Sequence, residues 1–226
     1  MDNYGTNIEP FDRVTVFEPQ PAGSPRFQRF VRESGNLDYR TTVWTWLSLL
    51  LIVLAYPGQA LLGFTTDPTA LLKSLTPELL VITLIVTILF QWFVYMFNYI
   101  ALKSEQTGVA GIGIKKLQGI HVAWGVTFVI AANLLLSGLA WALAQIGLPV
   151  NGDIEFLVPT FAGGKVIWIL VALTAGFCEE VAFRGYLMTR LRLLGKFDSW
   201  LIPVIVSAVL FGICHAYQGI PNMIVL

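Results

Sequence analysis

The chain has 226 residues and no formal net charge at pH 7, and 56% of its residues are hydrophobic while 12% are charged. Its mean hydropathy is +0.71. About a quarter of the residues of a soluble domain are charged, so this composition excludes an ordinary soluble protein. The lack of net positive charge argues against nucleic acid as a partner. The two cysteines, Cys178 and Cys214, lie in apolar segments, where thiols are usually small buried hydrophobes.

Residues 1–40 are polar and contain several prolines and charged side chains. They contain no apolar core followed by a small-residue cleavage site, so they do not have the pattern of a cleavable signal peptide. We expect this segment to be a disordered cytoplasmic tail, with a short interfacial stretch around residues 27–31.

Five apolar segments follow, at residues 41–64, 79–102, 120–146, 165–183 and 200–216. Each approaches or exceeds the roughly 20 residues that an α-helix needs to cross a bilayer. Strands are not expected, because an open sheet edge cannot be satisfied in lipid. The sequence therefore predicts an all-α integral membrane protein, with a multi-helix transmembrane bundle over residues 41–226. A further apolar run opens at Ile220, and we expect it to be the start of a sixth helix in which the chain is truncated.

The basic residues predict how these helices are oriented. Most of them fall in the N-terminal tail and in the second and fourth loops: Arg26, Arg29, Arg32, Arg40, Lys103, Lys115, Lys116, Arg190, Arg192 and Lys196. The third loop contains Asp153 and Glu155 instead. We therefore expect the N-terminus to be cytoplasmic, in the plasma (inner) membrane if the protein is bacterial.

Two adjacent carboxylates, Glu179 and Glu180, interrupt the segment 165–183. A charged residue at the centre of a membrane helix costs about 2.5 kcal/mol or more on insertion scales. Its presence therefore indicates either a structural partner or a function. In an α-helix Glu180 can pair with Arg184, four positions on, and this would be a purely structural explanation. Glu179 is five positions from Arg184 and does not share that explanation. An unpaired carboxylate away from water suits a general base that works near neutral pH.

His215 lies at the end of the last full apolar segment, and its expected depth sets it apart from an ordinary structural histidine. We expect a tight turn before that segment, with Gly195 as the residue after one helix and Asp198 or Ser199 as the N-cap of the next. Glu179 and His215 then lie at depths of roughly 24 and 26 Å from the turn, at 1.5 Å per residue. The sequence therefore predicts that the two side chains face one shared cavity.

Residues 179–184, Glu-Glu-Val-Ala-Phe-Arg, resemble the EExxxR motif of the CAAX prenyl endopeptidase and bacteriocin-processing family, also called the Abi family. Residues 211–215, Phe-Gly-Ile-Cys-His, resemble the second motif of that family, FxxxH. The two motifs lie on consecutive predicted helices, and the likeness covers residues 165–226.

This resemblance implies an intramembrane endopeptidase that cleaves membrane proteins or lipidated peptides. It implies that Glu179 and His215 activate a water, and that Glu180, Arg184 and Phe211 support the site. The third motif of the family, a histidine followed four residues later by Asn or Asp, does not occur after His215. Its absence agrees with the expected truncation.

Three alternatives remain open at this stage. Glu179 and His215 could be zinc ligands, although the HExxH pattern is absent and we favour a site without a metal or other cofactor. Intramembrane acids also mark proton or ion paths, so the chain could be part of a relay or transporter. It could also be a non-catalytic membrane protein that binds a partner, as in bacteriocin immunity.

Overall fold

The computed structural model describes residues 23–65, 75–150 and 158–215, and the ordered elements within these ranges are helices. The all-α architecture predicted from the sequence is therefore confirmed. In chain order the elements are α1 (Pro25–Glu33), α2 (Val43–Thr65), α4 (Pro77–Ser104), the 3-10 helix η1 (Val109–Ile112), α5 (Gly119–Gln145), α6 (Ala162–Glu179), the π-helical η3 (Glu180–Leu187), α7 (Met188–Gly195) and α8 (Leu201–Cys214). The expected start of a sixth helix lies outside the described residues.

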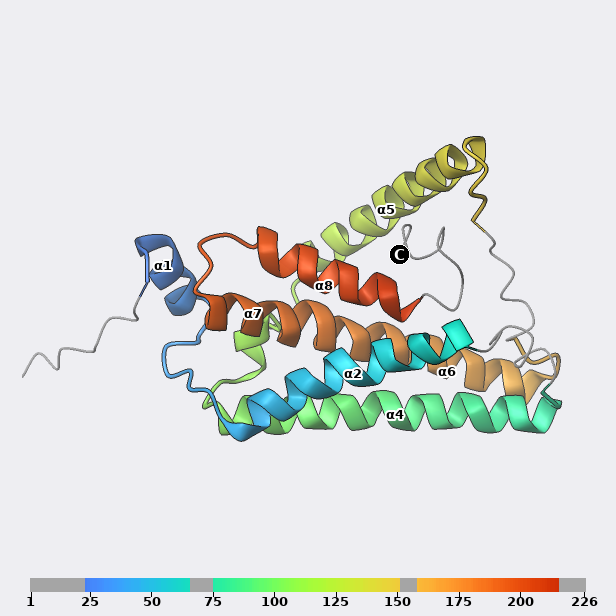
Figure 1. Ribbon diagram of the computed structural model, residues 1–226, viewed down its shortest axis with the longest axis horizontal. Coiled ribbons are helices and arrows are strands. Elements are labelled where there is room, and N and C mark those ends of the chain that lie inside the picture. Colours follow the sequence, from blue (N-terminus) through green and yellow to red (C-terminus); the bar gives the residue numbers. More distant parts are fainter. Residues whose placement is uncertain (1–22, 66–74, 151–157, 216–226) are drawn as a thin grey trace, which may run out of the picture.

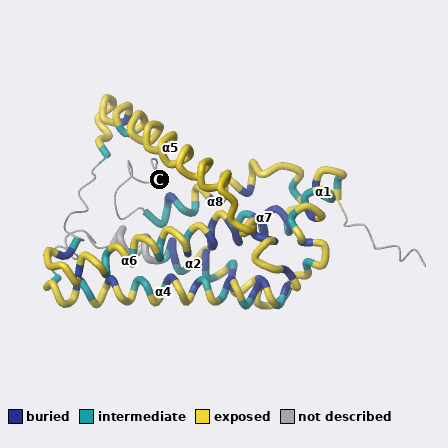
Figure 2. Tube along the Cα trace, turned by 180° about the vertical axis from the view of Figure 1, so that it is seen from behind, coloured by how far each residue is buried: buried dark blue, intermediate teal, exposed yellow. Residues whose placement is uncertain are grey.

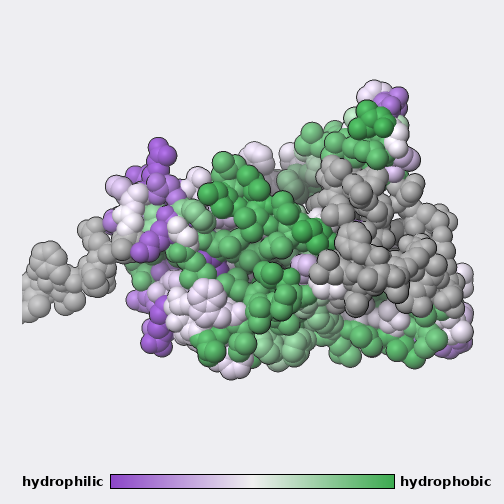
Figure 3. Space-filling model, in the orientation of Figure 1, coloured by the Kyte–Doolittle hydropathy of each residue, from purple (hydrophilic) through white to green (hydrophobic). Residues whose placement is uncertain are grey.

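Three of the described helical elements are long and apolar enough to cross a membrane: Pro77–Ser104, Gly119–Gln145 and the continuous element Ala162–Gly195. Two shorter apolar helices accompany them, Val43–Gly58 and Leu201–Cys214. Hydrophobic residues cover the middle of the molecule on the face shown in Figure 3, and hydrophilic residues gather around α1. The protein is an integral membrane protein, as its composition predicts.

The bundle is formed by α2, α4, α8 and the element α6–η3–α7, which lie side by side along the long axis of the molecule (Figure 1). α5 leaves this bundle at an angle and is exposed along most of its length, with Leu143 as its one buried residue (Figure 2). The hydrophobic core lies around η3, where Phe183 and Tyr186 pack with Ile52 of α2 and Val94 of α4. Residues 180–187 are thus at the centre of the packing.

The helix α1 contains the interfacial stretch predicted at residues 27–31. It begins at an N-cap, Ser24, whose hydroxyl accepts a hydrogen bond from the backbone N–H of Phe27 at 3.2 Å. Its apolar face, with Phe27 and Val31, packs against Leu193 of α7. Residues 23–33 therefore differ from the disordered tail predicted for residues 1–40, because this apolar face is buried. Residues 1–22 lie outside the described part of the chain.

The turn between α7 and α8 lies where the sequence predicts it, but its capping differs. The left-handed residue is Lys196, with φ of 49°, and Gly195 is the last residue of α7. Trp200 is the N-cap of α8, in place of the predicted Asp198 or Ser199. Asp198 has another role, because its carboxylate accepts a hydrogen bond from the Ser24 hydroxyl and so joins α1 to the turn.

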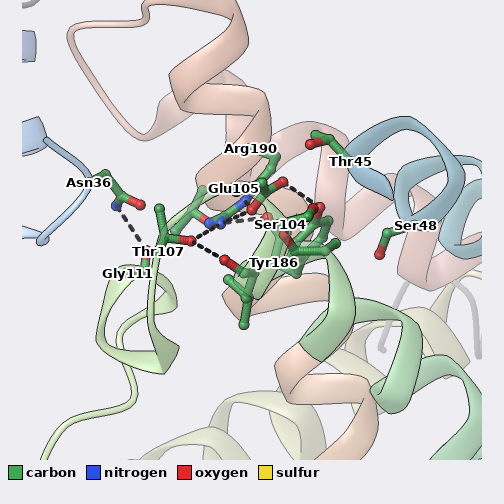
Figure 4. Close-up of polar contacts among 12 residues, drawn as sticks. Asn36, Thr45, Ser48, Ser104, Glu105, Thr107, Gly111, Tyr186 and Arg190 are labelled. Carbon is green, nitrogen blue, oxygen red and sulfur yellow. Dashed lines mark hydrogen bonds and ion pairs between the residues drawn. The ribbon is translucent and has the colours of Figure 1, made fainter. Parts of the chain in front are cut away.

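A fully buried ion pair connects the end of α4 with α7 (Figure 4). Arg190 donates to Glu105 through Nε at 3.1 Å and through Nη2, and the Tyr186 hydroxyl donates to the second oxygen of Glu105 at 2.7 Å. The guanidinium also donates to Thr107 at 2.9 Å and to Thr189 at 3.0 Å. The sequence places Arg190 among the basic residues of the fourth loop, but it lies in α7 and is fully buried, because its carboxylate partner lies inside the protein.

We expect Arg190→Met to lower the free energy of unfolding by about 3–5 kcal/mol, because it leaves Glu105 as a buried charge without its partner. The double variant Glu105→Leu/Arg190→Met should recover part of this loss, since no buried charge remains. Thermal unfolding in detergent measures both effects. Lys116→Gln, an exposed change between η1 and α5, is the control and should stay within about 0.5 kcal/mol of the original chain. A single variant as stable as this control would contradict the structural role of the pair.

Candidate active site

Glu179 is the last residue of α6, and a side chain from α4 holds its carboxylate. The Gln91 amide donates from Nε2 to Oε1 of Glu179 at 2.9 Å, and the Gln91 carbonyl accepts a hydrogen bond from the Tyr56 hydroxyl of α2. Gln91 and Tyr56 are buried, whereas Glu179 is half-buried. One chain of hydrogen bonds thus joins three helices and fixes the orientation of this carboxylate.

The π-helical segment η3 begins directly after Glu179. Hydroxyl groups donate to three of its backbone carbonyls. Ser207 of α8 donates to the carbonyl of Phe183 at 3.1 Å. Thr189 donates to the carbonyls of Gly185 and Tyr186 at 2.7 and 3.0 Å. Such wide turns are rare and often occur at functional sites. From the sequence this segment is expected to be a regular α-helix, because no local pattern of side chains predicts a π-turn.

Glu180 forms an ion pair with Arg184, with 2.7 Å between Oε1 and Nη1. This pairing is the one that the i,i+4 spacing predicts, and it is confirmed. The two side chains are 58% and 44% exposed, so the pair lies at the surface of the chain. The Arg184 guanidinium also lies over the ring of Phe211, 4.5 Å from its centroid. Arg184 therefore connects η3 with α8 through a cation–π contact.

His215 follows the last helical residue of α8, and its Nδ1 lies 2.9 Å from the carbonyl oxygen of Phe211. A carbonyl oxygen only accepts, so this hydrogen bond requires the proton on Nδ1 and leaves the lone pair of the neutral ring on Nε2. The Phe211 ring packs against the imidazole in a tilted arrangement, with 4.7 Å between the ring centroids.

Contacts where η3 meets α8 thus connect four of the five residues predicted from the two motifs: Glu180, Arg184, Phe211 and His215. A cavity shared by Glu179 and His215, with a bridging water, stays a prediction. Gln91 and Tyr56 are not among the residues predicted from the sequence. Gln91 could have been found, because an amide inside an apolar segment needs a polar partner and so indicates a contact between helices.

Comparison with known families bears on the same region. Residues 161–226 match the family described as Rce1-like, type II CAAX prenyl endopeptidase Rce1-like. The resemblance is confirmed over this segment. The Rce1-like match includes both motifs, while Gln91 and Tyr56 lie outside it. No curated protein and no solved structure matches the chain significantly.

We expect Gln91→Leu to lower the free energy of unfolding by about 1–3 kcal/mol, because it removes a partner from both the Tyr56 hydroxyl and the Glu179 carboxylate. Glu180→Gln should cost no more than about 1 kcal/mol, since its ion pair is exposed and Arg184 keeps its contact with Phe211. Thermal unfolding of the two variants in the same detergent makes the comparison. A larger loss for Glu180→Gln than for Gln91→Leu would be inconsistent with this structure.

Proposed function

We propose that the protein is an intramembrane endopeptidase that hydrolyses peptide bonds of membrane-associated substrates. The observation that supports this most is the arrangement of Glu179 within the Rce1-like segment. Its carboxylate is oriented by Gln91, whereas Glu180 is paired with Arg184. We therefore assign Glu179, rather than Glu180, as the carboxylate of the EExxxR motif that acts on a water.

In the proposed reaction, Glu179 takes a proton from a water that His215 orients through Nε2. The water oxygen attacks the carbonyl carbon of the substrate peptide, and negative charge develops on the carbonyl oxygen. Glu179 returns the proton to the amide nitrogen as the C–N bond breaks, which releases a carboxylic acid and an amine. Since Gln91 holds the carboxylate in place before the substrate arrives, little reorganisation is needed at this step.

The surroundings of the site determine which substrates reach it. The helices that carry Glu179 and His215 have exposed apolar side chains, such as Leu173, Phe177 and Val209. A substrate that approaches through the bilayer meets this surface, so we propose a membrane protein or a lipidated peptide as the substrate. We also propose that the basic end of the bundle and the N-terminus face the cytoplasm, in the inner membrane if the protein is bacterial.

We expect Glu179→Gln to abolish hydrolysis, with a loss of at least about 100-fold, because an amide cannot accept the proton from water. Glu180→Gln is the matched control, since it changes the adjacent carboxylate, and it should retain measurable activity. The measurement is a comparison of cleaved membrane-protein termini in cells that contain the original protein, either variant or none. Equal loss in the two variants would refute the assignment of the base. Proton flux in liposomes that depends on Glu179, without any cleavage, would favour a relay instead.

We propose a site that works without a metal, and chelation tests this. Hydrolysis by the purified protein should survive a strong chelator, because Glu179 and His215 activate the water by themselves. Zinc is the alternative to this proposal. Activity that is lost on chelation and restored by zinc would assign Glu179 and His215 as zinc ligands.

A further inference from the structure

A cavity of about 540 Å³ opens at the end of the bundle where α1, η1 and α7 meet. Its lining is strongly basic, with five cationic side chains and one carboxylate: Arg26, Arg29, Lys115, Arg184, Arg192 and Glu33. Like charges gathered in one cavity repel one another unless an anion enters. The proposed hydrolysis assigns no role to four of the five cations.

Two kinds of cation line this cavity. Arg26, Arg29 and Lys115 are exposed, and within the described part of the chain none of them forms an ion pair. Arg192 is 6% exposed and fixed in position.

Arg192 is fixed by rings and carbonyls together. Its guanidinium lies against both the Phe30 and the Trp200 ring, 4.0 and 4.4 Å from their centroids. It donates to the backbone carbonyls of Phe197 and Asp198 at 3.1 and 2.9 Å. The cavity thus combines the fixed positive charge of Arg192 with three exposed cationic side chains that can turn toward a ligand.

Apolar side chains also line the cavity, among them Phe30, Ile112, Met188 and Trp200. Directly after Trp200, the first residues of α8 are apolar and exposed, with Leu201 at 65% and Ile202 at 49%. The hydrophilic end of the molecule around α1 borders the hydrophobic surface at this level (Figure 3). A ligand here meets positive charge on one side and lipid-facing apolar surface on the other.

We propose that this cavity binds the phosphate-bearing headgroup of an anionic phospholipid, whose acyl chains lie along the start of α8. Arginine side chains bind phosphate oxygens through paired hydrogen bonds, and basic pockets beside membrane helices bind anionic headgroups. A small soluble anion would use the charges but not the apolar wall. Arg184 lines the cavity and contacts Phe211, so the bound lipid would lie beside the candidate active site.

Native mass spectrometry of the purified full chain in a neutral detergent tests this proposal. The probes are phosphatidylglycerol and phosphatidylcholine with identical acyl chains. We expect phosphatidylglycerol to bind at least about tenfold more tightly. The triple variant Arg26→Gln/Arg29→Gln/Lys115→Gln should lose most of this preference.

The matched control is Arg32→Gln/Arg40→Gln/Lys116→Gln, which removes the same number of exposed cations from neighbouring positions that do not line the cavity. It should keep the preference. Equal losses in the two triple variants would overturn the proposal, because the effect would then be general surface charge. Displacement of the lipid by inorganic phosphate would assign the cavity to a soluble anion. Displacement by a peptide with a free carboxyl terminus, but not by its amide, would assign it to peptide binding.

Discussion

Polar side chains inside this apolar bundle must find their partners within the protein, because the surrounding lipid supplies none. Gln91 meets this constraint with an amide that donates and accepts at once, to Glu179 on one side and from Tyr56 on the other. A second polar contact between α2 and α4 joins Ser48 with Asn98. Since lipid tails are as apolar as the helices themselves, such contacts and close packing are what hold membrane helices together. The position of Glu179 is thus a consequence of how the bundle is assembled.

The same constraint explains how a π-helical segment can occupy the centre of the core. A wide turn changes which amide reaches which carbonyl, and each buried carbonyl still needs a donor. Ser207 of α8 and Thr189 of α7 supply hydroxyl donors to the carbonyls of η3. As a result, α8 is bonded to the backbone of η3 itself, next to the residues of the EExxxR motif. The two family motifs are held together through the main chain as well as through side chains.

The sequence was sufficient for what depends on hydrophobicity and local spacing. It predicted the apolar helices to within a few residues at most ends, and it predicted the Glu180–Arg184 pair because four positions separate the two residues. It was insufficient where a partner is distant along the chain. The burial of Arg190 depends on Glu105, 85 positions earlier, and the order of α1 depends on Leu193 and Asp198. The π-turn after Glu179 depends on packing around it, and no residue within it indicates that geometry.

The wide turn of η3 also determines the directions in which the side chains of α7 point from the helix axis. Residues of α7 face the directions they do because eight positions, Glu180–Leu187, advance around the axis in π-helical rather than α-helical steps. Because a π-turn takes up one residue more than an α-turn, closing it to a regular α-helix while keeping all eight residues would turn α7 by about 100°. Arg190 would then leave Glu105, and Arg192 would leave the rings of Phe30 and Trp200. The π-helical segment beside Glu179 therefore contains one residue that a regular α-helix would not accommodate. That residue fixes the rotation of α7, and so the orientation of its side chains in the basic cavity, relative to Glu179.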